Sequence, residues 1–171
     1  MRAYGTNPQS IALGDLDGDG KPDLAVANLS SNTVSVYRNT SSSGSIGIGS
    51  FATKVDFITG FIPRSVAIGD LDGDGKLDLA IANYGSATVS VFRNTSSSGS
   101  IGSGSFAPNV DFPTGTGPHS VALGDLDGDG KPELAVANSG SNVSPQLTPS
   151  FNTSVDLRPL SKIKYTHDKG N

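Results

Sequence analysis

The chain has 171 residues, of which 35% are hydrophobic and 6% aromatic, and its formal net charge is −4 with no cysteine. The composition excludes disulfide bonds and thiol redox chemistry, and no apolar run reaches the roughly 20 residues of a membrane-spanning helix. The acidic balance argues against a nucleic-acid partner, because proteins that bind nucleic acids carry basic patches.

The first third of the chain predicts short strands joined by turns. Four segments alternate apolar with small or polar side chains, which is typical of half-buried strands. They are residues 10–14, 24–28, 33–39 and 51–57. In the second of these segments two alanines lie opposite Leu24 and Val26, which leaves room for a neighbouring sheet to pack close. No segment shows a sustained helical period, so we predict an all-β fold.

A Gly/Ser-rich segment, residues 39–50, separates the third and fourth of these strands. One interpretation of such a segment is a flexible linker. Ile46 returns as Ile101 in the corresponding segment 94–105, however, which a spacer would not need. We therefore favour a long hairpin loop at the rim of each unit.

The chain repeats itself with a constant period. Residues 11–21 return at 66–76 and again at 121–131, each time 55 positions later. A fixed period of this size is the signature of a repeat architecture. We predict three units that are β-propeller-like blades of four antiparallel strands. Their bounds are 1–60, 61–115 and 116–157, followed by a C-terminal tail at 158–171.

The third unit departs from the pattern. Residues 151–157 resemble the fourth strand of the first unit, but they arrive ten positions early. The ten missing residues would belong to the third strand and the rim loop of this unit. The tail matches no repeat, and we expect its end to be frayed.

An acidic loop follows the first strand of every unit, with the pattern D-x-D-G-D-G-x-x-D, or Glu at the last position of the third. Its carboxylates at positions 1, 3, 5 and 9 and a carbonyl at position 7 offer hard oxygen ligands, of which Ca²⁺ takes about six to eight. The glycines at positions 4 and 6 allow a positive φ, so the backbone can wrap an ion. Zinc and copper fit poorly without soft ligands, and Mg²⁺ demands stricter geometry.

Two other interpretations of the acidic loop fit less well. A plain hairpin turn needs only one Asp-Gly pair, whereas each loop carries four carboxylates. An EF-hand needs an acidic residue at position 12, where this chain has valine or isoleucine, and it also needs flanking helices. Twelve of the 16 acidic residues lie in the three loops, so three bound Ca²⁺ ions would change the formal charge from −4 to +2.

The sequence VALGDLDGDGKPELAVAN and its two relatives in the chain resemble the FG-GAP/VCBS repeat family, which forms the blades of integrin-alpha-type β-propellers. The resemblance covers about residues 5–143, and 151–157 weakly. It implies one blade per unit, with Ca²⁺ in the loop between the first two strands. The ligands it implies, with the lysines contributing carbonyl oxygens, are Asp15, Asp17, Asp19, Lys21 and Asp23, then Asp70, Asp72, Asp74, Lys76 and Asp78, then Asp125, Asp127, Asp129, Lys131 and Glu133.

Three blades do not close a propeller, which needs about four to eight. Two copies would complete a six-bladed ring as a homodimer, and pairs of this symmetry are the commonest oligomers. The chain would otherwise be a piece of a longer protein or a short stack. The homodimer and the piece of a longer protein are favoured equally.

The resemblance implies a calcium-binding module for adhesion or recognition, with a protein or glycan as ligand. Calcium would be mainly structural, and the rim loops 40–50 and 95–105 would carry the binding. We expect an extracellular or cell-surface location, although the first ten residues lack the apolar core of a secretory signal.

Two alternatives are a non-catalytic scaffold and a fragment of a polysaccharide-active enzyme. His119 and His167 do not recur between units, and no nucleophile or phosphate-loop motif is present. Asp56, Asp111 and Asp156 do recur, but we expect these strand residues to pair with neighbours. We expect no enzymatic activity.

Overall fold

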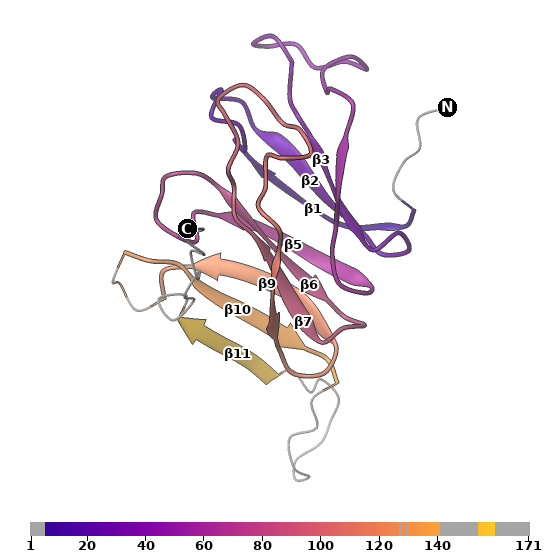
Figure 1. Ribbon diagram of the computed structural model, residues 1–171, viewed down its shortest axis with the longest axis vertical. Coiled ribbons are helices and arrows are strands. Elements are labelled where there is room, and N and C mark those ends of the chain that lie inside the picture. Colours follow the sequence, from indigo (N-terminus) through magenta and orange to yellow (C-terminus); the bar gives the residue numbers. More distant parts are fainter. Residues whose placement is uncertain (1–5, 127, 129, 141–153, 160–171) are drawn as a thin grey trace, which may run out of the picture.

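The computed structural model describes residues 6–126, 128, 130–140 and 154–159, the last of these by its backbone. All regular structure in these residues is β-strand, which confirms the all-β prediction. The strands form three antiparallel sheets, one in each repeat (Figure 1). The described part of the chain contains no helix long and apolar enough to cross a membrane.

The first two repeats are four-stranded meanders, in which chain neighbours are also sheet neighbours. The strands of the first repeat are β1 (Pro8–Gly14), β2 (Asp23–Asn28), β3 (Thr33–Tyr37) and β4 (Val55–Ile58). Those of the second are β5 (Pro63–Gly69), β6 (Asp78–Asn83), β7 (Thr88–Phe92) and β8 (Val110–Pro113). The register is the same in both, since Ala25 lies opposite Val36 as Ala80 lies opposite Val91. The prediction of four-stranded antiparallel blades is confirmed for these repeats.

The third and fourth strands are shorter than the predicted segments 33–39 and 51–57. The ladder stops at Tyr37 because the backbone beyond it has other partners. The amide N of Asn39 donates to the Asp23 carboxylate at 2.7 Å, and Asn39 meets Phe51 only as an isolated bridge. Residues 39–50 then form a hairpin closed by a hydrogen bond from the Thr40 amide to the Ser50 carbonyl at 2.7 Å.

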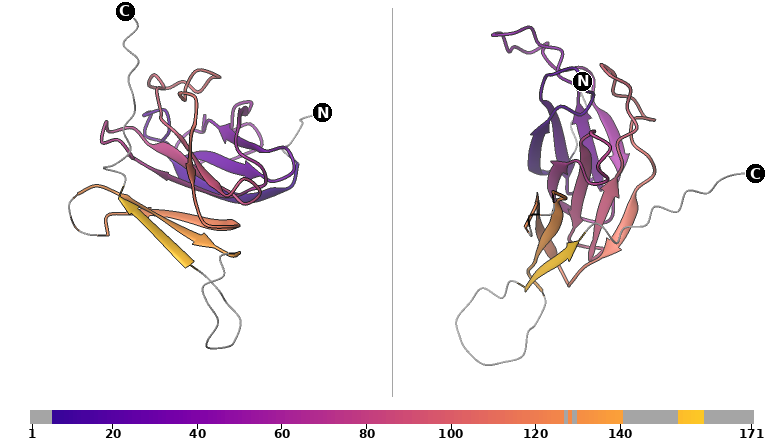
Figure 2. Two further views of the ribbon diagram at one scale, coloured as in Figure 1. Left: turned by 60° about the horizontal axis from the view of Figure 1, so that its bottom comes forward. Right: turned by 90° about the vertical axis from the view of Figure 1, so that its left-hand side faces the viewer.

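The same closure recurs in the second repeat, where the Thr95 amide donates to the Ser105 carbonyl at 2.8 Å. We call residues 39–50 and 94–105 the first and second rim hairpins. They rise from the same side of the sheets (Figure 2). The prediction of hairpins in place of flexible linkers is confirmed.

The third repeat differs from the predicted four-stranded blade. Its sheet contains β9 (Pro118–Gly124), β10 (Glu133–Asn138) and β11 (Ser154–Pro159), in the order β11-β10-β9. β11 pairs directly with β10, so it takes the place of the third strand and not the predicted place of the fourth. The reason is the shortened connection: 15 residues separate β10 from β11, against 26 between β2 and β4. The strand also crosses the predicted boundary at 157, and the rest of the tail lies outside the described residues.

The core of the molecule lies between successive sheets. In the first interface the fully buried Ala25 and Ala27 of one sheet share a cluster with Leu79 and Ile81 of the next. The second interface repeats this arrangement between β6 and β10. The alanines therefore do let the next sheet pack close, as predicted from the sequence.

Each interface joins two unlike sheet faces. The later repeat contributes aliphatic side chains of its first two strands, and the earlier repeat contributes alanines of its second strand and valines of its third. The three sheets follow one another along the longest axis, and the described strands do not close into a ring (Figure 1).

Candidate metal centre

Three acidic loops connect the first two strands of the repeats. They are acidic loop 1 (residues 15–23), acidic loop 2 (70–78) and acidic loop 3 (125–133). The glycines at positions 4 and 6 have the positive φ values expected of them, for example +69° at Gly18 and +86° at Gly20. Residues other than glycine rarely adopt a positive φ, so these glycines permit the tight curl of each loop.

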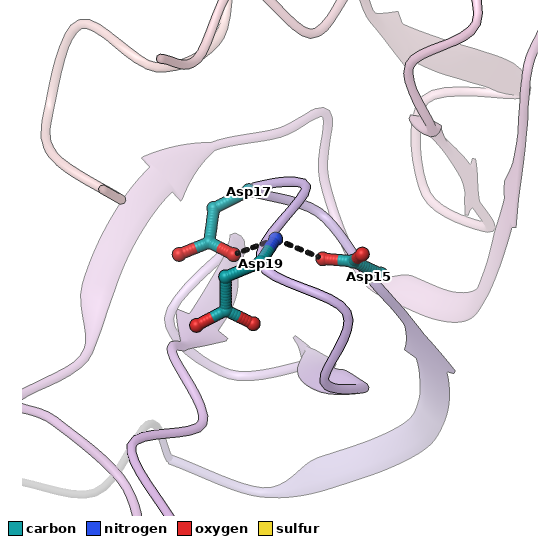
Figure 3. Close-up of side chains that lie close together, drawn as sticks. All are labelled: Asp15, Asp17 and Asp19. Carbon is teal, nitrogen blue, oxygen red and sulfur yellow. Dashed lines mark hydrogen bonds between the residues drawn. The ribbon is translucent and has the colours of Figure 1, made fainter. Parts of the chain in front are cut away.

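Backbone amides of acidic loop 1 turn inward onto its carboxylates. Asp15 accepts hydrogen bonds from the amides of Asp19 at 3.1 Å and Gly20 at 2.8 Å, and Asp17 accepts one from Asp19 at 3.2 Å. As a result, one carboxylate oxygen each of Asp15, Asp17 and Asp19 lies within 4.8 Å of the others (Figure 3). Three hard ligands thus converge before any ion is added.

Acidic loop 2 has the same curl, with Asp70 accepting from the amides of Gly73, Asp74 and Gly75. Its converging oxygens belong to Asp70, Asp72 and Asp78, so the fourth predicted carboxylate, Asp74, does not belong to that group.

Acidic loop 3 repeats part of this pattern. Asp125 accepts from Gly128 at 2.7 Å and from Gly130 at 2.9 Å. Asp127 and Asp129 lie outside the described residues, so a third site stays a prediction.

The carboxylate at position 9 has a role that sequence reasoning missed. Asp23 is fully buried, and its two oxygens accept from the amides of Leu16 at 3.0 Å and Asn39 at 2.7 Å. Asp78 has the corresponding two bonds, and Glu133 accepts from the Leu126 amide at 2.7 Å. In the first two repeats this residue therefore ties the start of the acidic loop to the first residue of the rim hairpin that follows the third strand. The sequence could have indicated this role, because the residue at position 9 comes directly before a predicted strand.

The charge balance of acidic loop 2 suits a cation. Burial raises the pKa of the Asp78 carboxyl to about 6, and the nearby carboxylates of Asp72 and Asp74 add to the rise, against two backbone hydrogen bonds. Burial likewise raises the pKa of Asp23, with smaller contributions from Asp17 and Asp19. A bound cation would offset both the burial and the repulsion, so the residues fit a divalent ion.

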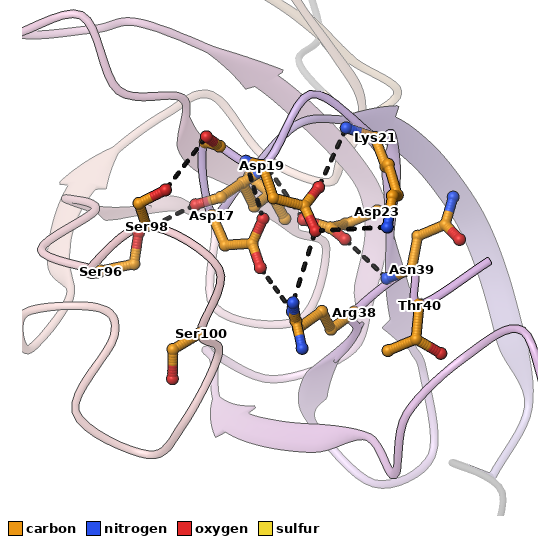
Figure 4. A network of polar contacts seen from close by, with 12 residues as sticks. Asp17, Asp19, Lys21, Asp23, Arg38, Asn39, Thr40, Ser96, Ser98 and Ser100 are labelled. Carbon is orange, nitrogen blue, oxygen red and sulfur yellow. Dashed lines mark hydrogen bonds and ion pairs between the residues drawn. The ribbon is translucent and has the colours of Figure 1, made fainter. Parts of the chain in front are cut away.

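Arginines that the sequence reasoning did not single out contact both loops. The Nε of Arg38 lies 2.6 Å from an Asp17 oxygen, and its Nη2 lies 3.4 Å from an Asp19 oxygen (Figure 4). Arg93, 55 positions later, lies 3.8 Å from Asp72. Each arginine thus neutralises part of the loop charge. The sequence could have indicated this role, because Arg38 and Arg93 are separated by the repeat period of 55 residues.

The lysines at position 7 have separate contacts. The Nζ of Lys21 lies 3.9 Å from an Asp19 oxygen, whereas the Nζ of Lys76 donates to the Ser96 carbonyl at 3.0 Å. Carbonyl ligation by Lys21, Lys76 and Lys131 stays a prediction.

The second rim hairpin lies against acidic loop 1 of the preceding repeat. Asn94 and Ser96 donate from their side chains to the Leu16 carbonyl at 2.7 and 3.0 Å, and the Gly99 amide donates to the Asp17 carbonyl at 2.9 Å. A cavity of about 310 Å³ is lined by these two segments and by Gly75, Lys76 and Leu77 of acidic loop 2. The candidate site therefore depends on two repeats.

The recurring aspartates outside the loops pair with neighbours, as predicted. Asp56 accepts from the Ser35 hydroxyl at 2.5 Å and forms an ion pair with Lys54, and Asp111 accepts from the Ser90 hydroxyl at 2.6 Å. The side chain of Asp156 and all of His167 lie outside the described residues. His119 is an exposed residue of β9.

These features define a class: a tandem-repeat β-protein whose blades carry an acidic loop at the same edge. A family model described as an FG-GAP-like repeat matches residues 15–81 and 70–136. The chain belongs to the FG-GAP-like repeat family, as the resemblance predicted. A search of curated proteins found no match.

Proposed function

We propose that the acidic loops bind Ca²⁺ and that the chain is a calcium-stabilised recognition module. The observation that carries this proposal is the convergence of three carboxylate oxygens within 4.8 Å in each of acidic loops 1 and 2. Loops that contain only hard oxygen donors and curl through positive-φ glycines suit Ca²⁺ better than Mg²⁺, which requires near-ideal octahedral geometry. The family supports this assignment, since FG-GAP repeats are often calcium-binding.

The ion would act as a structural clamp. Acidic loop 1 contacts the first rim hairpin through Asp23 and the next repeat through the Leu16 and Asp17 carbonyls. An ion bound to this loop would stiffen the contacts to both elements. Because the curled loop exists only in the folded chain, binding stabilises the fold by mass action. Acidic loop 3 would form a third site with Asp125 and Glu133.

Recognition of a protein or glycan ligand is the second part of the proposal. FG-GAP repeats occur typically in extracellular proteins that bind other proteins, and millimolar extracellular calcium would fill the loops. At the tip of the first rim hairpin Ile46 and Ile48 are 78% and 97% exposed, and we propose this tip as the contact with the ligand. We propose a non-catalytic role. The remaining alternatives are a scaffold and a fragment of a polysaccharide-active enzyme.

Titration calorimetry on chelator-treated protein tests the metal assignment. We expect saturable Ca²⁺ binding below millimolar concentration and weaker Mg²⁺ binding. Asp70→Asn should remove one site, while Asp111→Asn, outside the acidic loops, should leave every site in place. Absence of Ca²⁺ binding at millimolar concentration would show that the assignment is wrong. A glycan array and a polysaccharide-depolymerisation assay separate recognition from the two alternatives.

A further inference from the structure

The two outermost sheet faces of the described repeats differ from the internal ones. We call the face of each sheet that points toward the preceding repeat its front face, and the opposite face its back face. In both internal interfaces a front face with aliphatic side chains on its first two strands packs against a back face with alanines on its second strand and valines on its third. The glycine at the end of the first strand belongs to the same back face. The front face of the first repeat and the back face of the third have no such partner among the described residues.

The front face of the first repeat exposes side chains that are buried in the other repeats. Ile11 is 60% exposed, whereas its equivalents Val66 and Val121 are each 6% exposed. Leu13 is 65% exposed, whereas its equivalents Ile68 and Leu123 pack against the clusters between sheets. Ile11 and Leu13 pair with Val26 and Leu24 across β1 and β2, so they form one continuous apolar surface.

The back face of the third repeat is open in the complementary way. A Cβ placed on Gly14 would lie 2.8 Å from Ile68, and one placed on Gly69 would lie 3.0 Å from Leu123, whereas one on Gly124 meets nothing within 4 Å. Among the described residues, therefore, no side chain fills the space beside Gly124 that an aliphatic side chain fills beside Gly14 and Gly69. Leu126 is 62% exposed, whereas Leu16 and Leu71 at the same position are 1% and 8% exposed.

We propose that the front face of the first repeat binds the back face of the third repeat in a second copy of this chain. Leu13 of one copy would lie against Gly124 of the other, as Ile68 lies against Gly14 inside the chain. The occupant is specified by the chain itself, because the same pairing of unlike faces forms both of its internal interfaces. This inference goes beyond the proposed function and does not depend on the identity of the metal.

Polar groups at the two end faces match in the same way. Inside the chain the Val66 amide donates to the Ser10 hydroxyl, and the Val121 amide donates to the Ser65 hydroxyl, each at 3.2 Å. The next pair in this series is the Ile11 amide with Ser120, an exposed residue of the third repeat.

The rim hairpins also have equivalent positions that would meet in the contact between copies. In the second rim hairpin Asn94 and Ser96 donate to the Leu16 carbonyl. The residues at these positions in the first rim hairpin are Asn39 and Ser41. Contact between copies would place them over the carbonyl of Leu126, as Asn94 and Ser96 lie over the carbonyl of Leu16.

An interface between unlike faces is heterologous, so each copy offers one front and one back face. Two copies that pair through both ends would contain six repeats, a number within the usual range for closed propellers. Should the rotation not close after two copies, the same contact would add further copies.

Cross-linking between two variants tests the contact, and the absence of native cysteine makes the result unambiguous. Leu13→Cys and Gly124→Cys proteins are mixed and treated with a short bis-maleimide. We expect a covalent dimer in the mixture and little in either variant alone. A mixture of Ser30→Cys with Gly124→Cys is the matched control, since Ser30 is exposed in the turn between β2 and β3, at the end of the sheet away from Leu13. Equal cross-linking in the control and test mixtures would overturn the proposal.

Mass in solution gives a second test. Light scattering of the native chain should give a multiple of the 17.4 kDa chain mass, and Leu13→Asp should reduce it to a single chain. Leu13 is mostly exposed within one copy, so this substitution should not unfold the chain, which circular dichroism checks. Ile58→Asp, at an exposed edge residue of β4, should leave the mass unchanged, because the equivalent Pro113 stays exposed at the internal interface. A native chain that stays at 17.4 kDa at micromolar concentration, as it would if the front face served a preceding repeat of a longer polypeptide, overturns the proposal.

Discussion

At the scale of single residues, the carboxylates of one acidic loop have different roles. Asp70, Asp72 and Asp78 converge at the candidate site, and Asp78 is in addition buried and accepts two backbone hydrogen bonds. Asp74 accepts one bond from the neighbouring Lys76 amide and is exposed. The four acidic positions of the motif therefore contribute unequally to folding and to binding.

Replacing Asp78 with alanine should destabilise the metal-free protein. The substitution leaves the buried amides of Leu71 and Asn94 without an acceptor, which we expect to lower the free energy of unfolding by about 2–5 kcal/mol. Urea denaturation in the presence of chelator measures the loss. Asp74→Ala in the same loop is the control and should cost less than about 1 kcal/mol. Equal losses would show that burial of Asp78 has no special role.

Replacing Arg38 with glutamine should strengthen calcium binding at acidic loop 1. Arg38 lies 2.6 Å from Asp17, so its charge repels a cation bound there. Loss of this charge should lower the Kd of one site by about two- to tenfold at low ionic strength, and the effect should shrink in salt. Lys54→Gln, whose partner Asp56 lies outside the loops, should leave the calcium titration unchanged. A weaker site in Arg38→Gln would mean that the arginine orders the loop more than it repels the ion.

At the scale of elements, the second rim hairpin is part of the site of the preceding repeat. Its residues are glycine and serine for the most part, a composition that by itself also suits a linker. What orders it is a set of specific hydrogen bonds to the carbonyls of Leu16, Asp17 and Gly18. The hairpin and acidic loop 1 should therefore gain order together when an ion binds.

Replacing Ser96 with alanine tests this coupling. The change removes a buried hydrogen bond to the Leu16 carbonyl, worth about 0.5–1.5 kcal/mol, and should lower Tm by about 1–6 °C. It should also weaken calcium binding at one site, although Ser96 lies outside every acidic loop. Ser97→Ala, at the exposed neighbouring position, is the matched control. If calcium affinity stays unchanged while Tm falls, the hairpin supports the fold but not the site.

At the scale of the whole molecule, stability should depend on calcium. Each site filled at a hundredfold excess over its Kd stabilises the folded chain by about 2.7 kcal/mol. For a chain of this length that amounts to about 5–10 °C in Tm per site. We expect chelation to lower Tm by at least this amount in differential scanning calorimetry, and Ca²⁺ to restore it more fully than Mg²⁺. A Tm that chelation does not change would contradict a structural role for the ion.

Much of the architecture follows from local sequence because the repeats are self-similar. Alternation in 24–28 predicted a strand with one alanine face, and the structure buries Ala25 and Ala27 against the next sheet. The glycines of the acidic loops predicted positive φ values, which Gly18 and Gly20 have. Turn chemistry and strand periodicity depend on near neighbours in the chain, so they are readable without the fold.

Contacts between distant segments were not readable in this way. The place of 154–159 beside β10 depends on which strand edge is left open, and 151–157 by its sequence had predicted the fourth place. The double role of Asp78 depends on the Asn94 amide, 16 positions away. The resemblance implied that all four carboxylates of each loop are ligands, whereas the structure distinguishes them by burial and by which oxygens converge.

The sequence by itself determined the period, the strands, the curl of the acidic loops and the hard-oxygen character of the candidate sites, because each of these depends on residues close together in the chain. Only the tertiary structure decided which carboxylates converge, which one is buried as a hydrogen-bond acceptor, and which apolar faces have a partner. Those outcomes depend on the packing of one sheet against the next, which brings together residues more than 50 positions apart, as Gly14 and Ile68 show.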